Sequence, residues 1–244
     1  MRVIILAAGR GSRMGILTDH RPKGLTKLGG ISLLERQISV LRHSDIEQIG
    51  IVRGYMAERI QLPNITYFHN AIWNETNMLY SLLCAEDWLS ADECIVAYSD
   101  IVYQREAIRM MCDCPADLAV PFNLHWLKLW IDRFEDPLTD AETFRINENK
   151  MLIEIGERTR SLDRIEGQFM GLMKTTPKGW SRLKGLLEPL SDAEVWSMDI
   201  TAMLSLAIRK GIEIQGLPYD GFWLEVDSES DLRRYERDYV HQLN

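Results

Sequence analysis

The residues of this chain best suited to chemistry lie in its first 27 positions, where glycines and cations follow an apolar run. Val3 to Leu6 shows no polar alternation, which is typical of a strand buried on both faces of a parallel sheet. The run leads directly into Ala7-Ala8-Gly9-Arg10-Gly11-Ser12-Arg13. Small residues let backbone N–H groups approach an anion, and Arg13 and Lys23 add charge suited to phosphate oxygens. The stretch therefore predicts a site for a nucleoside triphosphate, made by Ala7, Ala8, Gly9, Gly11, Ser12, Arg13 and Lys23.

Two other glycine loops do not fit this stretch. A dinucleotide fingerprint needs G-x-G-x-x-G, but Met14 stands where the third glycine belongs. The next predicted strand also ends on Arg53 and not on the acid that would bind a ribose hydroxyl. A P-loop would close with G-K-S or G-K-T, and the sequence contains no such triplet. The cations, more than the glycines alone, indicate phosphate binding.

Two aspartates follow apolar runs far apart in the chain. Asp100 comes after the strand predicted at Cys94 to Tyr98, and Asp227 comes after Phe222 to Val226. Ligands of open α/β sheets lie at the carboxyl ends of strands, and a buried carboxylate is costly without a cation. The pair predicts a Mg²⁺ site, with Lys23, Arg13 and Asp100 as the catalytic residues. A helix-capping role for Asp100 is the alternative, which the continuing apolar run disfavours.

A polar segment from Asn70 to Trp88 allows two interpretations. Asn77 or Thr76 would cap a helix whose apolar face continues to Leu89. The segment is then either an ordinary amphipathic helix or a contributor to the nucleotide site. In the second case Asn77 and Ser81, together with Ser99, would lie near the base or ribose.

The order of predicted elements must place these residues at one edge of a sheet. Strands at 3–6, 48–52 and 65–68 alternate with helical segments, the first of them a helix from about 33 to 44 with a Ser32/Glu35 capping box. Further predicted elements are strands at 94–103, 118–121, 168–174 and 212–217, a hairpin at 144–155, and helices at 198–210 and 229–241. This order predicts an α/β fold with a Rossmann-like, mixed but mostly parallel sheet flanked by helices. We expect a single domain over 1–244 with small inserted substrate-binding elements.

Composition limits the partners and the compartment. The 244 residues carry a formal net charge of −8, which argues against nucleic acid or an anionic membrane as a partner. The four cysteines form no C-x-x-C pair, and no apolar run is long enough to cross a membrane. Met1 leads straight into a predicted core strand, so a cytoplasmic, reduced protein is expected.

Seven segments spread along the chain resemble one enzyme family. They are LAAGRGSRM, RPKGL, TNMLYSLLCA, YSDIVY, DAETFRI, IEGQFMGLMKTTPKGW and EVDSESDL. They resemble bacterial cytidylyltransferases acting on phosphocholine, 2-aminoethylphosphonate or phosphoglutamine, which are relatives of the hexose-1-phosphate nucleotidyltransferases. The resemblance implies CTP at Gly9, Gly11, Arg13 and Lys23, and Mg²⁺ at Asp100 and Asp227. It departs at Glu157-Arg158, where relatives often carry a lysine, so a phosphate-binding role there is less secure.

The acceptor is predicted from residue chemistry. An amine or quaternary ammonium needs carboxylates and aromatic faces, and the predicted acceptor residues are Trp126, Asp140, Glu142, Arg158 and Glu166. Core packing is the alternative for Trp126. The predicted reaction is direct in-line attack of a small phosphate- or phosphonate-bearing acceptor on CTP, which releases pyrophosphate.

Two other function classes remain open at this stage. One is a hexose-1-phosphate nucleotidyltransferase that uses UTP or dTTP. The other is a regulator that binds a nucleotide without turnover, which intact Lys23, Asp100 and Asp227 disfavour. The oligomeric state also stays open, with a homodimer among the options.

Overall fold

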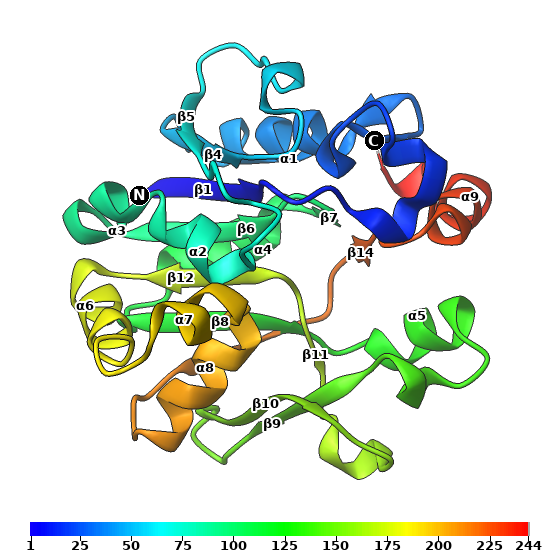
Figure 1. Cartoon of the computed structure of the whole chain (residues 1–244). Helices are drawn as coiled ribbons and strands as arrows, with labels where there is room; N and C mark the ends of the chain where they lie inside the picture. Colours follow the sequence, from blue (N-terminus) through cyan, green and yellow to red (C-terminus); the bar gives the residue numbers. More distant parts are fainter. Residues whose placement is uncertain (244) are drawn as a thin grey trace.

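The computed structural model describes residues 1–243 and is built around an eight-stranded sheet (Figure 1). In spatial order the strands are β11 (Gln168–Phe169), β8 (Leu118–Asn123), β12 (Leu172–Thr175), β6 (Cys94–Tyr98), β1 (Arg2–Ala7), β4 (Ile49–Arg53) and β5 (Thr66–His69), with β13 (Gln215–Tyr219) beside β8. β1 is parallel to both neighbours, whereas β12 runs antiparallel between β6 and β8. The predicted mixed, mostly parallel α/β fold is confirmed.

The side chains of β1 alternate between two hydrophobic cores, one on each face of the sheet. Val3 and Ile5 belong to the core that α1 and α4 cover, and Ile4 and Leu6 to the core that α2, α3, α6 and α8 cover. This explains why the strand has no polar alternation. The helices are α1 (Leu33–Arg42), α2 (Met78–Leu83), α3 (Glu86–Ala91), α4 (Arg105–Asp113), α5 (Trp126–Arg133), α6 (Pro177–Gly185), α7 (Asp192–Ser197), α8 (Ile200–Arg209) and α9 (Glu229–Asp238).

Three small antiparallel pairs lie outside the main sheet. They are β9 (Glu142–Ile146) with β10 (Leu152–Arg158), β7 (Ile101–Tyr103) with β14 (Trp223–Glu225), and β2 (Lys27–Leu28) with β3 (Ile31–Ser32). Figure 1 shows the β9–β10 hairpin beyond β8 and β11, at the opposite end of the sheet from β4 and β5. Short 3₁₀ turns are η1 (Ser12–Thr18), η2 (Lys23–Leu25), η3 (Ala57–Arg59), η4 (Pro137–Thr139), η5 (Leu162–Arg164) and η6 (Val240–Gln242). Among residues 1–243, no helix is both long and apolar enough to cross a membrane.

Several predicted boundaries are wrong for local reasons. The strand predicted at 168–174 is split into β11 and β12, because the chain turns at Gly171, where φ is +69° and a Cβ would lie 3.0 Å from the Tyr98 ring. The predicted 198–210 helix begins only at Ile200, because the Asp199 side chain caps it. The segment after Asn77 forms two helices where one was predicted, and α7 was not predicted at all.

Candidate active site

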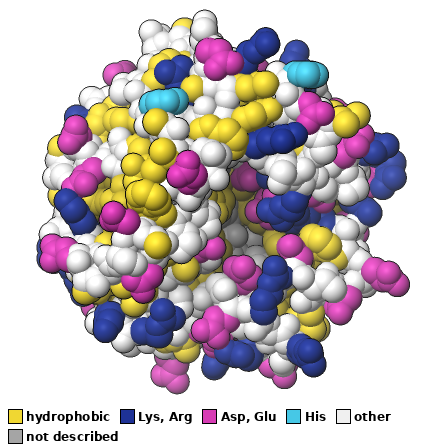
Figure 2. Space-filling model, viewed as in Figure 1, with side chains coloured by type: hydrophobic (Ala, Val, Ile, Leu, Met, Phe, Trp, Pro, Cys, Tyr) yellow, Lys and Arg dark blue, Asp and Glu magenta, His cyan; other side chains and the backbone are white. Residues whose placement is uncertain are grey.

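A cavity of about 630 Å³ gathers most of the predicted site residues. Figure 2 shows the molecule hollowed near the centre of this face, with Lys, Arg, Asp and Glu side chains around the hollow. The predicted residues that line the cavity are Gly9, Gly11, Ser12, Arg13, Lys23, Asn77, Ser99, Asp100, Asp140, Glu142, Arg158 and Asp227. The nucleotide, metal and acceptor predictions therefore meet in one space.

Other predicted residues do not line this cavity. Ala7 and Ala8 are buried in the core beneath the loop. Ser81 is buried, and its hydroxyl accepts a hydrogen bond from Asn70 Nδ2 at 3.0 Å, which corrects its predicted contact with base or ribose. Trp126 is packed in the hydrophobic core, and the Glu166 carboxylate accepts the backbone N–H of Ile146 at 3.1 Å. The predicted acceptor contacts of Trp126 and Glu166 are thus not supported.

The glycine loop owes its shape to a close approach between Gly11 and Lys23. Gly11 has φ +73°, and a Cβ there would lie 2.7 Å from the Lys23 side chain. The Thr18 hydroxyl donates to the Gly11 carbonyl at 3.2 Å and links the two ends of the η1 segment. Lys23 is consequently only 7% exposed, although it is charged.

The Lys23 ammonium lies between the two predicted metal ligands. Its Nζ donates to Asp100 Oδ2 at 2.6 Å and to Asp227 Oδ1 at 2.7 Å. Burial would lower the pKa of Lys23, but the charges of the two aspartates outweigh it, so the pKa is raised. Burial likewise opposes ionisation of Asp227, yet Lys23 and then Arg13, whose Nη2 is 3.0 Å from Oδ1, lower the pKa of that carboxyl. The shifts of Lys23 and Asp227 therefore both favour the charged forms of this pair.

The pairing of β7 with β14 brings the two aspartates together. Ile101 pairs with Glu225, and the Val226 N–H donates to the Asp100 carbonyl at 2.9 Å. Asp100 and Asp227 thus stand at the same end of a two-stranded ribbon. The sequence shows each apolar run but not their pairing.

Arg133 supports the site and was not predicted from the sequence. Its side chain is 1% exposed and contacts the carboxylates of Glu225, Asp227 and Asp231 at 3.2, 3.3 and 3.1 Å. Glu225 also lines the cavity, and burial together with the charge of Asp227 raises its pKa. A single arginine at the end of α5 carries no local signal of such a role.

A second acidic group lines the cavity from other elements. Glu142 and Arg158 pair across the β9–β10 hairpin, and Asp140 Oδ2 accepts the indole N–H of Trp130 at 3.1 Å. Asp199, which sequence reasoning missed, lines the cavity as the N-cap of α8. Its proximity to the hairpin depends on how distant segments pack, and this leaves no local signal in the sequence.

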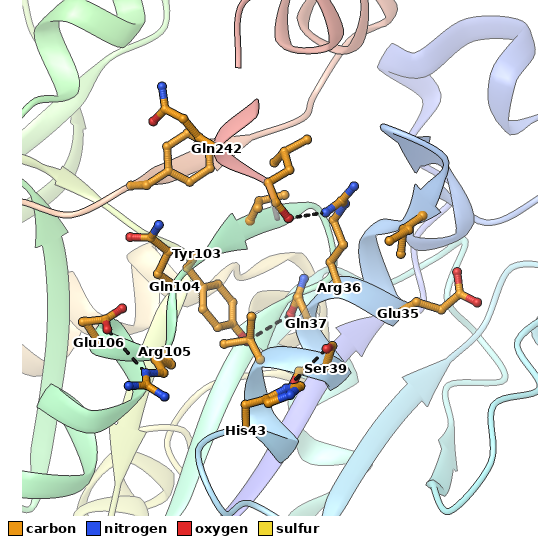
Figure 3. Close-up of a pocket in the computed structure, with 15 residues that line it drawn as sticks. Glu35, Arg36, Gln37, Ser39, His43, Tyr103, Gln104, Arg105, Glu106 and Gln242 are labelled. Atoms are coloured by element: carbon orange, nitrogen blue, oxygen red, sulfur yellow. Dashed lines mark hydrogen bonds and ion pairs between the residues drawn. The ribbon is translucent and has the colours of Figure 1, made fainter. Parts of the chain in front are cut away.

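A second cavity, of about 520 Å³, lies between α1, the start of α4 and the C-terminal segment (Figure 3). Its charged side chains already have partners. Glu35 accepts from the Ser32 N–H and hydroxyl, Arg36 Nη1 donates to the Leu243 carbonyl at 2.8 Å, and Arg105 pairs with Glu106. None of the predicted site residues lines it.

Residues 3–135 match the family model described as a MobA-like NTP transferase domain. The chain belongs to this family. It is a nucleotidyltransferase, as predicted. A CTP:phosphoglutamine cytidylyltransferase of Campylobacter jejuni is 31% identical over 95% of this chain and 98% of that protein. A choline-phosphate cytidylyltransferase of Haemophilus influenzae is 36% identical over 43% of this chain and 46% of that protein.

Sugar-phosphate enzymes are also similar to this nucleotidyltransferase. The UTP–glucose-1-phosphate uridylyltransferase AglF of Haloferax volcanii is 31% identical over 95% of this chain and 93% of that protein. Among solved structures, the inositol-1-phosphate CTP transferase of T. maritima has a TM-score of 0.78 and 19% identity, covering 99% of this chain and 94% of that one. The structural likeness supports the fold.

Proposed function

We propose that this nucleotidyltransferase transfers CMP from CTP to a small acceptor that carries a phosphate or phosphonate and an amine, releasing pyrophosphate. The observation that carries the proposal is the single cavity, which joins a cationic glycine loop, a carboxylate pair and a second acidic group. The activity named for the Campylobacter relative supports the same chemistry, because phosphoglutamine has an amine and a phosphoryl group.

The proposed reaction is one in-line displacement. An oxygen of the acceptor phosphate attacks the α-phosphorus of CTP, and the bond from that phosphorus to the bridging oxygen breaks as pyrophosphate leaves. Arg13 would neutralise the leaving pyrophosphate. Lys23 uses two N–H donors on the aspartates and keeps a third for the phosphates, whose mutual repulsion it would reduce. Positioning and charge neutralisation account for most of the catalysis in such transfers.

The proposal includes Mg²⁺ held by Asp100 and Asp227. Asp100 Oδ1 is a buried oxygen with no hydrogen-bond partner among the described residues, so it is available as a ligand for a cation. Residues 1–243 contain no group of three or more His, Cys, Asp or Glu side chains placed to hold a metal. Two carboxylates with nucleotide phosphates and water are an ordinary donor set for Mg²⁺. When bound, the ion would neutralise charge at the α-phosphate.

A hexose-1-phosphate acceptor with UTP or dTTP is the second candidate. The similarity to AglF over 95% of the chain favours it. Against it, the acceptor end of the cavity presents the carboxylates of Asp140, Glu142 and Asp199, and a hexose-1-phosphate offers no cation to neutralise them.

A pyrophosphate-release screen tests the proposal. CTP, UTP and dTTP are each paired with phosphocholine, 2-aminoethylphosphonate, phosphoglutamine and glucose-1-phosphate, with Mg²⁺ present or removed by EDTA. We expect turnover with CTP and an amine acceptor only when Mg²⁺ is present. Preference for UTP or dTTP with glucose-1-phosphate would support the second candidate, and nucleotide binding without any turnover would support a regulator.

A further inference from the structure

Glu142 and Asp199 lie close together because of a glycine in the neighbouring strand. Gly156 on β10 has φ +82°, and a Cβ there would lie 2.9 Å from Thr201 Cβ in the first turn of α8. The absence of that Cβ lets the start of α8, with its Asp199 cap, pack against the β9–β10 hairpin that carries Glu142. Two carboxylates from distant parts of the chain then face the same cavity.

The carboxylate oxygens of Glu142 and Asp199 accept few hydrogen bonds from the described residues. Asp199 Oδ1 accepts the Ala202 N–H at 2.7 Å and the Thr201 hydroxyl at 3.0 Å, which leaves Oδ2. Within residues 1–243 the Glu142 carboxylate has neither a hydrogen-bond partner nor an ion pair, and burial followed by the charge of Asp199 raises its pKa. Arg158 is the cation beside them, but its Nη1 donates to the carbonyls of Thr139 and Asp140. The pair thus has no hydrogen-bonded or ion-paired cation among the described residues, and the charge of Arg158 only partly offsets the two carboxylates.

A second unused polar group faces the same cavity. Tyr98, the last residue of β6, lines the cavity, and its hydroxyl has no hydrogen-bond partner in the described chain. Burial and then the charges of Asp199 and Asp100 raise the pKa of this phenol, so it remains uncharged near both the predicted metal ligands and the Glu142/Asp199 pair. The Tyr98 hydroxyl is therefore available to a ligand that extends from the predicted metal ligands to the Glu142/Asp199 pair.

The aromatic residues of the cavity do not form an open cage. Trp130 is stacked on Trp223 with ring centroids 6.1 Å apart at 8°, and the Arg133 guanidinium lies 5.0 Å from its ring. The other two rings, Tyr98 and Phe169, meet edge to face at 86°. A quaternary ammonium has no N–H and depends on several ring faces. A primary ammonium has three N–H donors, which suit carboxylate oxygens.

We infer that Glu142 and Asp199 bind a primary ammonium group of the acceptor and select against its N-methylated forms. The inference deepens the proposed function and rests on it, because it concerns the acceptor of the same transfer. It assigns Asp199 as a specificity-determining residue and removes Trp126 and Glu166 from that role.

A methylation series tests this inference on the unaltered enzyme. Phosphoethanolamine, its N-methyl and N,N-dimethyl derivatives, and phosphocholine differ only in replacing N–H donors by methyl groups. With CTP and Mg²⁺ we expect kcat/KM to fall at each step, with phosphocholine at least roughly tenfold below phosphoethanolamine. Phosphocholine equal to or better than phosphoethanolamine would overturn the inference while leaving the proposed function intact. Absence of CTP turnover with every amine and phosphonate acceptor would overturn both.

Two variants with matched controls locate the effect. Asp199→Asn keeps an oxygen to cap α8, and Glu142→Gln keeps the shape of the side chain, so both are expected to fold. Each should raise the KM for phosphoethanolamine about ten- to a hundredfold and change the KM for CTP by less than about twofold. Exposed Asp192→Asn and Glu157→Gln should leave both constants unchanged. Unchanged acceptor KM in both site variants, or equal losses for phosphoethanolamine and phosphocholine, would contradict the assignment.

Discussion

The Lys23 ammonium donates a 2.7 Å hydrogen bond to Asp227 Oδ1 across 204 positions of sequence. Lys23 also donates a hydrogen bond to Asp100, so it is a counter-ion that both predicted metal ligands share. Removing one partner of a buried ion pair costs about 3–5 kcal/mol. We expect Lys23→Ala to lose stability of that order in EDTA and to regain part of it with Mg²⁺, measured by urea unfolding. If Mg²⁺ changed the stability of the wild type and of Lys23→Ala equally, the aspartates would not bind the ion in place of the lysine.

The same lysine should affect rate more than nucleotide affinity. Its charge is needed most when the acceptor phosphate closes on the α-phosphate, so Lys23→Ala should lower kcat by orders of magnitude with a smaller change in the Kd of CTP. Single-turnover kinetics and equilibrium CTP titration separate the two quantities. Equal losses in both would make Lys23 a binding residue only.

Asp100 and Asp227 should be required together. Asp100→Asn and Asp227→Asn each remove one charge from the predicted metal site, and each should cut turnover by at least about a hundredfold, because a metal site acts as a unit. Asp113→Asn, an exposed change at the end of α4, serves as the control for kinetics and melting temperature. Near-normal turnover in either site variant would exclude that residue from the metal site.

The parts of the site that follow strands could be predicted from the sequence. Asp100, Asp227 and Lys23 each stand next to an apolar run or a glycine loop, where local pattern and chemistry coincide. Arg133 and Asp199 could not be found this way, because their roles depend on which distant segments pack together. The β7–β14 pairing and the approach of α8 to Gly156 decide those contacts, and neither leaves a periodic signal.

The fold likewise combines features with a local sequence signal and features that depend on tertiary packing. The buried strands and the Ser32/Glu35 capping box were predicted, because hydrophobic periodicity and capping are local. Trp126 illustrates the limit, because Trp126 and Trp130 both belong to α5, yet only Trp130 lines the cavity. Periodicity gives a helix face but not which residue of that face meets a ligand.

Arg133 should act as a positioning residue for Asp227. Its guanidinium serves three carboxylates with three separate nitrogens, which one lysine ammonium cannot reproduce. We expect Arg133→Lys to fold with reduced stability and to need a higher Mg²⁺ concentration for half-maximal turnover, while Arg133→Met loses about 3–5 kcal/mol. Urea unfolding and Mg²⁺ titration measure these effects.

A control on α9 separates position from charge in that experiment. Arg237→Lys alters an exposed arginine of α9 and should change neither the stability nor the Mg²⁺ concentration needed for half-maximal turnover. If Arg133→Lys lowered stability but left the Mg²⁺ requirement as in the wild type, the residue would support the fold and not the carboxylate of Asp227.

Ionised Glu142 should lower the stability of the folded protein and strengthen binding of the acceptor, and both effects should depend on pH. Burial, then Asp199 and Asp140, raise its pKa above the ordinary 4.5, while Arg158 opposes the shift. An acid whose pKa is raised by folding destabilises the folded state once the pH exceeds its unfolded pKa, and this cost is complete above the folded pKa. Glu142→Gln should therefore melt a few degrees above the wild type at pH 8, and the difference should vanish below about pH 4.5.

The Glu142→Gln variant should also bind the amine acceptor less well at pH 8, whereas Glu157→Gln should change neither the melting temperature nor acceptor binding. A lower melting temperature for Glu142→Gln at pH 8 would mean that Glu142 stabilises the fold, and the interpretation of this carboxylate as one held ready for a cation would be wrong.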